Sequence, residues 1–349
     1  MTVPILLRSA FLLAITLLTA AGMTRAQGTR GIRDSVGFCW DARQMSRFVR
    51  FLDSLDARTP RHPSPIAAIS PHDDYLYAGR VYHPLFRDLR TREVVIFGVT
   101  HGTVRRAIGD PRNILLLEDH GSWTGPYGPV SCSPLREWIL QRMDESMVRI
   151  DRRAHQLEHS IEALIPFLQH HNRDIRITPI MVTAASFDSL NLLATRLAAV
   201  IADYISANNL QPGADISFLI SCDANHYGRD FGNSPWGEHQ AAHAMGTRED
   251  LNIIDECMTG ILDTERLRSL ATRLSAAYWC GRYSVPFGLL TVTNLFSALE
   301  LGDCAGTLYR YSDTCSEGVL PIHDTGMGTT APFSFQHWVG FFSAGFSPR

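Results

Sequence analysis

Side chains that bind metals or transfer protons follow three of the apolar runs in this sequence. They are His72, Asp73 and Asp74 after the run 66–70, His101 after the run 94–100, and Asp223 and His226 after the run 216–221. Imidazole nitrogens and carboxylate oxygens serve both as metal ligands and as acid–base groups. A single histidine after a strand is most often a loop residue bonded to backbone, but repetition at several strand ends favours a functional site.

The stretch "AAYWCGRYSVPFG" (276–288) places a cysteine where one helical pattern ends and another begins. A buried, inert thiol is the usual role of such a residue. Beside Gly281 and Arg282, however, the Cys280 thiolate could be stabilised and act as a metal ligand or a nucleophile. The spacing of His239 and His243 also fits two ligands on one helix, but no helical carboxylate accompanies them, so this metal signal is weak.

The elements that must position these residues alternate between strands and helices. Continuous apolar runs predict buried strands at 66–70, 94–100, 175–182 and 216–221, with helices at 42–55, near 80–90, and at 134–144, 158–171 and 186–206. This alternation predicts an α/β fold, with a central, largely parallel sheet flanked by helices. Ligands of such sheets bind beyond the carboxyl ends of the strands. We therefore expect the histidines and aspartates to meet there.

Some acidic residues near these positions have simpler interpretations. Asp73 or Asp74 could cap the following helix or form an Asx-turn. Glu158, His159 and Glu162 would lie in the first turn of the helix 158–171, where the helix dipole favours acids. That explanation is strong for Glu162, whereas the roles of Glu158 and His159 stay open.

The amino-acid composition excludes several kinds of binding and catalysis. The chain has 349 residues, 45% of them hydrophobic, and a net charge of −3. That charge gives no basic surface for nucleic acid. All 32 basic residues are arginines. The absence of lysine from the sequence excludes a Schiff-base lysine, a P-loop lysine and a Ser-Lys dyad. Catalysis would have to use His, carboxylates, Cys, Arg or a metal.

Residues 1–26 resemble a secretory signal peptide, followed by a single domain over 27–349. Arg8 precedes an apolar run too short for a typical membrane span, and Thr24 and Ala26 are small residues at a cleavage site. An uncleaved anchor is the alternative. We expect an exported protein, periplasmic or secreted, with no stable membrane span after cleavage. The seven cysteines are an odd number, so at least one has no intrachain partner, and the sequence does not determine any pairing.

The export prediction can be checked by intact mass. We expect protein from a secretion-competent host to begin at Gln27, because signal peptidase cleaves after small residues such as Ala26. A full-length, soluble product would contradict it.

Five motifs resemble those of the MEMO family, which includes AmmeMemoRadiSam system protein B, in order and approximate spacing. They are "SPHDDYLYAG", "GVTHG", "EHSIEALIPFL", "SCDANHYG" and "WCGRYSVPFG". The resemblance runs from about residue 37 to about residue 345. The family is similar in fold to class III extradiol dioxygenases. Two departures are Asp73-Asp74, where the family usually has Ala-Gly, and Gly102, where it usually has a second histidine.

The resemblance implies one mononuclear metal held by His72, His101 and Cys280, with His226 and Asp223 as catalytic residues. It also implies a small-molecule or peptide ligand in the metal crevice. Two imidazoles and a thiolate suit iron, copper or zinc. Fe(II) is the first choice, because the dioxygenase architecture leaves coordination positions open.

Three functions remain open from the sequence. The first is oxygen-dependent redox chemistry on a small, phenolic substrate, with His226 transferring protons and Asp223 orienting His226 or a water. The second is a non-catalytic metal-binding or peptide-binding protein on the same fold. The third is a cysteine hydrolase that uses Cys280 and His226.

Overall fold

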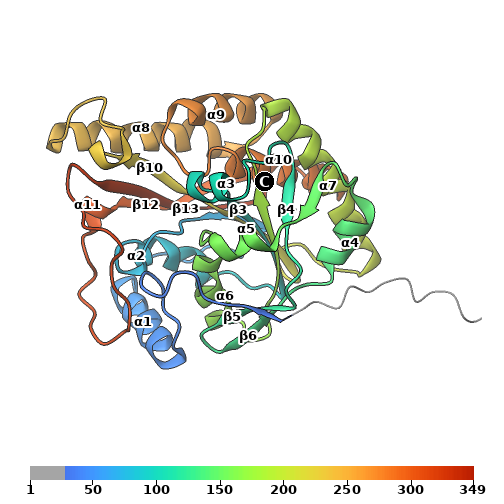
Figure 1. The fold of residues 1–349 in the computed structure, drawn as a ribbon, viewed down its shortest axis with the longest axis horizontal. Helices are drawn as coiled ribbons and strands as arrows, with labels where there is room; N and C mark the ends of the chain where they lie inside the picture. Colours follow the sequence, from blue (N-terminus) through green and yellow to red (C-terminus); the bar gives the residue numbers. More distant parts are fainter. Residues whose placement is uncertain (1–27) are drawn as a thin grey trace, which may run out of the picture.

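The computed structural model describes residues 28–349, which form one α/β domain (Figure 1). The predicted signal peptide lies outside the described residues. The strands are β1 (Thr29–Arg30), β2 (Ala67–Ser70), β3 (Glu93–Val99), β4 (Leu115–Leu117), β5 (Ser122–Gly125), β6 (Gly128–Ser131), β7 (Val148–Ile150), β8 (Arg176–Val182), β9 (Ile216–Ser221), β10 (Asp223–Tyr227), β11 (Gly260–Ile261), β12 (Cys304–Asp313) and β13 (Trp338–Pro348).

Helices cover the sheet between and beyond these strands. They are α1 (Ala42–Leu55), α2 (Tyr75–Phe86), α3 (Gly102–Ala107), α4 (Leu135–Arg142), α5 (Arg152–Leu157), α6 (Ile165–His171), α7 (Phe187–Ala207), α8 (Gln240–Met258), α9 (Thr264–Ala276), α10 (Ser284–Ala298) and α11 (Thr314–Glu317), with short 3₁₀ turns at Glu162–Leu164 and Arg229–Phe231.

The large sheet has the strand order β11-β12-β13-β2-β9-β3-β8-β4-β7, with β10 paired to β13. Its centre, β2, β9, β3 and β8, is parallel, while β13 and β4 run antiparallel to their neighbours β2 and β8. A second, three-stranded sheet joins β1, β5 and β6. The predicted strands and the largely parallel centre are confirmed.

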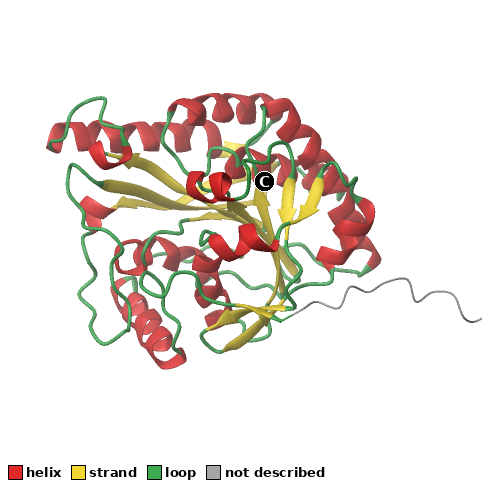
Figure 2. Ribbon diagram, in the orientation of Figure 1, coloured by secondary structure: helices red, strands yellow, loops and turns green. Residues whose placement is uncertain are grey.

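Both faces of the large sheet are buried under helices (Figure 2). Helix α10 packs on β9 and β3 from one side, together with α7 and α9, and α2 packs on β2, β12 and β13 from the other. Successive residues of a strand point to opposite faces. In β3, Val95 and Phe97 accordingly join one hydrophobic core, while Val94 and Ile96 join the other. This two-sided burial explains why the central strands read as continuous apolar runs.

Helix α7 is the one helix in residues 28–349 that is long and apolar enough to cross a membrane by length and composition. Half of its most apolar stretch is buried in the protein, and α7 packs against α4 and α10. It therefore forms part of the domain core.

Two predicted helices have different boundaries in the structure. Helix α2 begins at Tyr75 rather than near residue 80, because residues 75–79 already pack into the core. The predicted helix 158–171 is interrupted: α5 ends at Leu157, residues 158–161 form a loop, and α6 begins at Ile165. Glu158 and His159 therefore precede the helix instead of forming its first turn.

Glu162 does more than complement a helix dipole. Its buried carboxylate forms an ion pair with Arg30 and accepts hydrogen bonds from the backbone N–H groups of Arg33 and Asp34. Removing one partner of such a buried ion pair leaves the other charge unpaired, which lowers the stability of the fold by several kcal/mol. Glu162 thus ties the N-terminal segment of the domain to the loop that precedes α6.

Candidate metal centre

The carboxyl ends of β2, β9 and β3 are neighbours, and each continues directly into a candidate site residue. Ser70 of β2 lies opposite Ser221 of β9, so His72 and Asp223 emerge side by side. His101 follows β3, which pairs with β9 on its other side. The parallel order of these strands thus brings together residues that are about 30 to 150 positions apart in the sequence.

Cys280 reaches the same place from the turn between α9 and α10. That turn is held against β10 by backbone contacts: Asn225 forms a bridge with Trp279, and the His226 N–H donates to the Tyr278 carbonyl at 3.2 Å. The Asp223 N–H lies 3.1 Å from the Cys280 sulfur. The thiol is therefore positioned by main-chain pairing.

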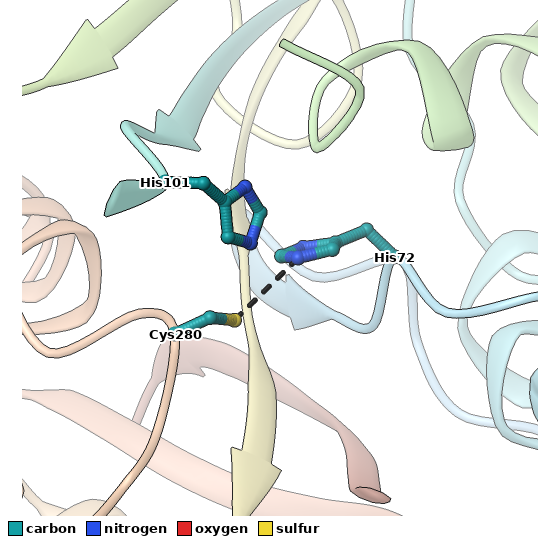
Figure 3. Close-up of side chains that lie close together, drawn as sticks. All are labelled: His72, His101 and Cys280. Carbon is teal, nitrogen blue, oxygen red and sulfur yellow. Dashed lines mark hydrogen bonds between the residues drawn. The ribbon is translucent and has the colours of Figure 1, made fainter. Parts of the chain in front are cut away.

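The three predicted ligands converge (Figure 3). His72 Nε2 lies 3.5 Å from Cys280 Sγ, and ligand atoms of His72, His101 and Cys280 all lie within 4.8 Å of one another. His72 is 2% exposed, whereas the side chain of His101 is 24% exposed. The group is thus buried on one side and open on the other.

Both histidines are held by their Nδ1 atoms, so their Nε2 atoms face the centre. Ser221 Oγ donates to the Ser160 carbonyl at 2.7 Å, so it accepts a hydrogen bond from His72 Nδ1–H, also at 2.7 Å. The Glu158 carboxylate accepts from His101 Nδ1–H at 2.8 Å. Metal-binding histidines commonly use their second ring nitrogen in this way, and such partners fix the tautomer and the ring orientation.

The contact between His72 and Asp223 also fits a cation between the predicted ligands. With its proton on Nδ1, His72 presents a lone pair from Nε2, and Asp223 Oδ2 lies only 3.3 Å away. Two lone pairs at this separation need a proton or a metal ion between them. Two imidazoles and a thiolate are a donor set for zinc, copper or iron. The residues therefore fit a bound transition metal.

The pKa shifts of His101 and Cys280 describe the centre before an ion binds. Burial would lower the pKa of His101, but the Glu158 carboxylate and Cys280 outweigh it and hold that pKa well above its usual range. Burial raises the pKa of the Cys280 thiol well above normal. Before an ion binds, the His101 imidazole therefore holds a second proton and Cys280 stays a thiol, so a metal ion would have to displace both protons.

Asp223 and His226 border the same centre but do not bond to each other through the imidazole Nδ1. His226 Nδ1–H donates to the Ala224 carbonyl at 3.0 Å, so the backbone orients the ring and Asp223 does not. Asp223 Oδ1 instead accepts from the His72 N–H at 2.9 Å. Because the proton of the neutral His226 ring is on Nδ1, its Nε2 is unprotonated and can accept a proton.

The protonation states of these two residues follow from their burial. Burial lowers the pKa of His226 to about 4, which keeps the imidazole neutral at pH 7. Burial raises the pKa of Asp223 to about 7, and Asp73 has a pKa well above its usual range because of burial and the Asp223 charge. Asp223 can therefore gain or lose a proton near neutral pH, whereas His226 is a neutral imidazole that can accept a proton from a ligand.

Two cavities meet at the centre. The larger, of about 410 Å³, is bordered by His101 and Cys280 and also by Arg105 and Arg282. The smaller, of about 230 Å³, is acidic, and its lining includes Asp34, Asp73, Asp74 and Asp223. His226 lines both cavities. A small ligand in the larger cavity would meet the open side of the proposed metal ligands and two guanidinium groups.

The sequence suggested that Asp73 or Asp74 caps the next helix or forms an Asx-turn, and the structure agrees with this only in part. Asp74 precedes α2, but its carboxylate forms no cap bond and accepts instead from the N–H and hydroxyl of Thr330. Asp73 Oδ1 accepts from the Asp74 N–H at 2.6 Å, a turn-like contact. Asp74 therefore fastens the loop that covers the smaller cavity.

The sequence left the role of Glu158 open and gave no role to Ser221, and it gave only a weak metal signal for the spacing of His239 and His243. Glu158 and Ser221, which hold the two imidazoles, are the first residues of the motifs "EHSIEALIPFL" and "SCDANHYG", but their roles could be found only through their contacts. His239 accepts from the Ala242 N–H and caps α8, so the His239–His243 spacing does not define a pair of ligands. All seven cysteines are free thiols within residues 28–349.

Comparisons with known proteins agree with the resemblance. The Memo-like protein family matches residues 39–313. A MEMO1 family protein of Saccharolobus islandicus is 32% identical over 165 residues, covering 46% of this chain and 52% of the relative. One from Sulfolobus acidocaldarius is 31% identical over 181 residues (50% and 58%), and one from Pyrococcus furiosus 27% over 180 residues (49% and 56%). The matches span little more than half the length of these relatives. On the family match, this chain belongs to the Memo-like protein family.

Proposed function

We propose that the protein is a mononuclear metal enzyme that carries out oxygen-dependent redox chemistry on a small phenolic substrate. His72, His101 and Cys280 would hold the metal, with Fe(II) as the first choice. The observation that carries this proposal is the pair of Nδ1 contacts, which aim two Nε2 atoms at one thiol beside a 410 Å³ cavity. When bound, the metal would supply Lewis acidity and one-electron chemistry.

The protein's own groups would bind the substrate and move its protons. Arg105 and Arg282 line the larger cavity and favour a substrate that becomes an anion, as a phenol does on losing its proton. His226 Nε2 would accept that proton, since its Nδ1 is committed to the Ala224 carbonyl. Asp223, with a pKa near 7, would take up or return a proton on the other side of the centre.

Metal analysis followed by oxygen uptake tests this proposal. Purified protein should contain close to one equivalent of metal at this centre. After anaerobic loading with Fe(II), it should consume oxygen with at least one member of a catechol panel. Metal without oxygen uptake would contradict an enzyme and favour a metal-binding or peptide-binding protein. A metal-free protein with a reactive Cys280 would favour the cysteine hydrolase.

The Glu158 carboxylate should strengthen metal binding through His101. Glu158→Gln keeps an acceptor for Nδ1–H but removes the negative charge that makes the imidazole more basic. We expect metal affinity to fall by roughly ten- to a hundredfold, as for other carboxylates behind ligand histidines. Competition with a chelator measures the change.

Glu162→Gln is the matched control, because Glu162 is also buried but bonds to Arg30 and the N-terminal segment. It should lower the melting temperature and leave metal affinity unchanged. Equal effects of the two substitutions on affinity would contradict the role given to Glu158.

We also propose that this chemistry takes place outside the cytosol, after removal of residues 1–26. The charge and apolar pattern of that segment support the proposal, and the mass measurement described for Gln27 tests it.

A further inference from the structure

A second group of potential metal ligands, an imidazole, a carboxylate and a thiol, lies on a different part of the fold. His243 on α8 has Nε2 at 2.9 Å from Asp313 Oδ1, at the end of β12. Cys315 lies in the short helix α11 that follows, and ligand atoms of the three residues are all within 4.8 Å of one another. The three residues come from two segments about 70 positions apart, so the tertiary fold creates the group.

The surroundings hold these side chains in place. The His243 ring packs edge-on against Trp338, with ring centroids 4.9 Å apart. Asp313 Oδ1 accepts from the N–H groups of Cys315 and Ser316, each at 2.8 Å, which turns the chain so that Cys315 returns toward the carboxylate. Asp313 is 1% exposed, whereas the side chain of His243 is 16% exposed. The group is thus fixed at its base and reachable from solvent.

We propose that His243, Asp313 and Cys315 form a second metal site, for a divalent cation of the zinc class. Imidazole, carboxylate and thiolate are the three ligand types that zinc uses, and water can complete the tetrahedron. Bonds of about 2.0 to 2.3 Å require ligand atoms roughly 3.3 to 3.8 Å apart. The His243 Nε2–Asp313 Oδ1 distance of 2.9 Å lies below that range and no pair of ligand atoms is more than 4.8 Å apart, so side-chain rotation would bring the three atoms to it.

Binding exchanges protons for the ion. The cation takes the place of the hydrogen bond between His243 Nε2 and Asp313 Oδ1, and the bound neutral imidazole carries its single proton on Nδ1. Cys315 loses its thiol proton to solvent as the sulfur–metal bond forms. Because the metal binds the thiolate and not the thiol, binding strengthens as pH rises.

The site does not depend on the proposed function. It shares no residue with His72, His101 and Cys280, and it can be occupied in a protein that has no enzyme activity. Each centre contains a single cysteine, so the two can be removed separately by serine substitution.

Cobalt(II) titration of chelator-treated, full-length protein tests the proposal, because thiolate-bound cobalt absorbs in the near ultraviolet. We expect two equivalents in the wild type, one in Cys280→Ser, one in Cys315→Ser and none in the double variant. Cys304→Ser, which alters another buried thiol, should keep both. His243→Gln retains a hydrogen-bonding group toward Asp313 and should lose the same equivalent as Cys315→Ser.

The Cys280→Ser protein separates the two claims. If it keeps one equivalent that disappears on adding Cys315→Ser, the second site is supported. If Cys315→Ser, with an unchanged melting temperature, binds as many equivalents as the wild type, the second site is wrong. If the Cys280→Ser protein binds no cobalt, the second site is also wrong, but the proposal of a central metal site still stands.

Discussion

His226→Ala is expected to lower oxygen uptake by roughly 10²-fold or more while the protein keeps its metal. A positioned acid–base group contributes about 10² to 10⁴ in rate. His226 lines both cavities, and its Nδ1 is bonded to the Ala224 carbonyl, so Nε2 is the atom that can accept a proton from a ligand. Metal content, melting temperature and oxygen uptake with the most active catechol should be measured on one preparation.

His323→Ala provides the control, since His323 is an exposed imidazole. If His226 only stabilised its loop, His226→Ala would lower stability by about 1 kcal/mol and leave the rate per folded molecule unchanged. If its metal content fell as far as that of His72→Ala, His226 would be a ligand and the proposed set of three would be wrong.

Cys280→Ser is expected to release most of the metal from the central site while the fold remains. A hydroxyl is a poor ligand at neutral pH, whereas a thiolate binds zinc, copper and iron strongly. The exchange of sulfur for oxygen is small, and backbone pairing of Trp279 and Tyr278 with β10 holds the turn in place. Metal analysis and a thermal melt on the same sample measure the outcome.

Cys257→Ser is the matched control, because Cys257 is 2% exposed and packs in a hydrophobic core. Equal metal losses in the two variants would mean that Cys280 has a structural role. Rapid alkylation of Cys280 in metal-free wild-type protein at neutral pH would argue for the hydrolase instead, because the raised thiol pKa predicts slow reaction.

The sequence predicted the central sheet and the meeting of its strand ends well. Residues of β2, β3, β8 and β9 are apolar on both faces, and this pattern arises because helices cover both sides. Parallel strands end at one edge of the sheet, so His72, His101 and Asp223 could be placed near one another without coordinates. The approach of Cys280 rested on the resemblance to the MEMO family.

What the sequence did not predict depends on contacts between distant segments. The sequence pattern predicts a helix at Glu158, yet the chain there forms a loop that carries its carboxylate to His101. Asp223 seemed suited to orient His226, but β10 pairs with β13 through an irregular register between these residues, and the imidazole turns to a backbone carbonyl. A change in strand register re-aims side chains, and no local pattern reveals it.

Anomalous diffraction from crystals of the metal-loaded protein, recorded at the absorption edge of the bound metal, would locate the ion relative to the three ligands. We expect a peak between His72 Nε2, His101 Nε2 and Cys280 Sγ, about 2.0 to 2.3 Å from each of them. A peak at another site, with none among these three atoms in protein that contains stoichiometric metal, would contradict it.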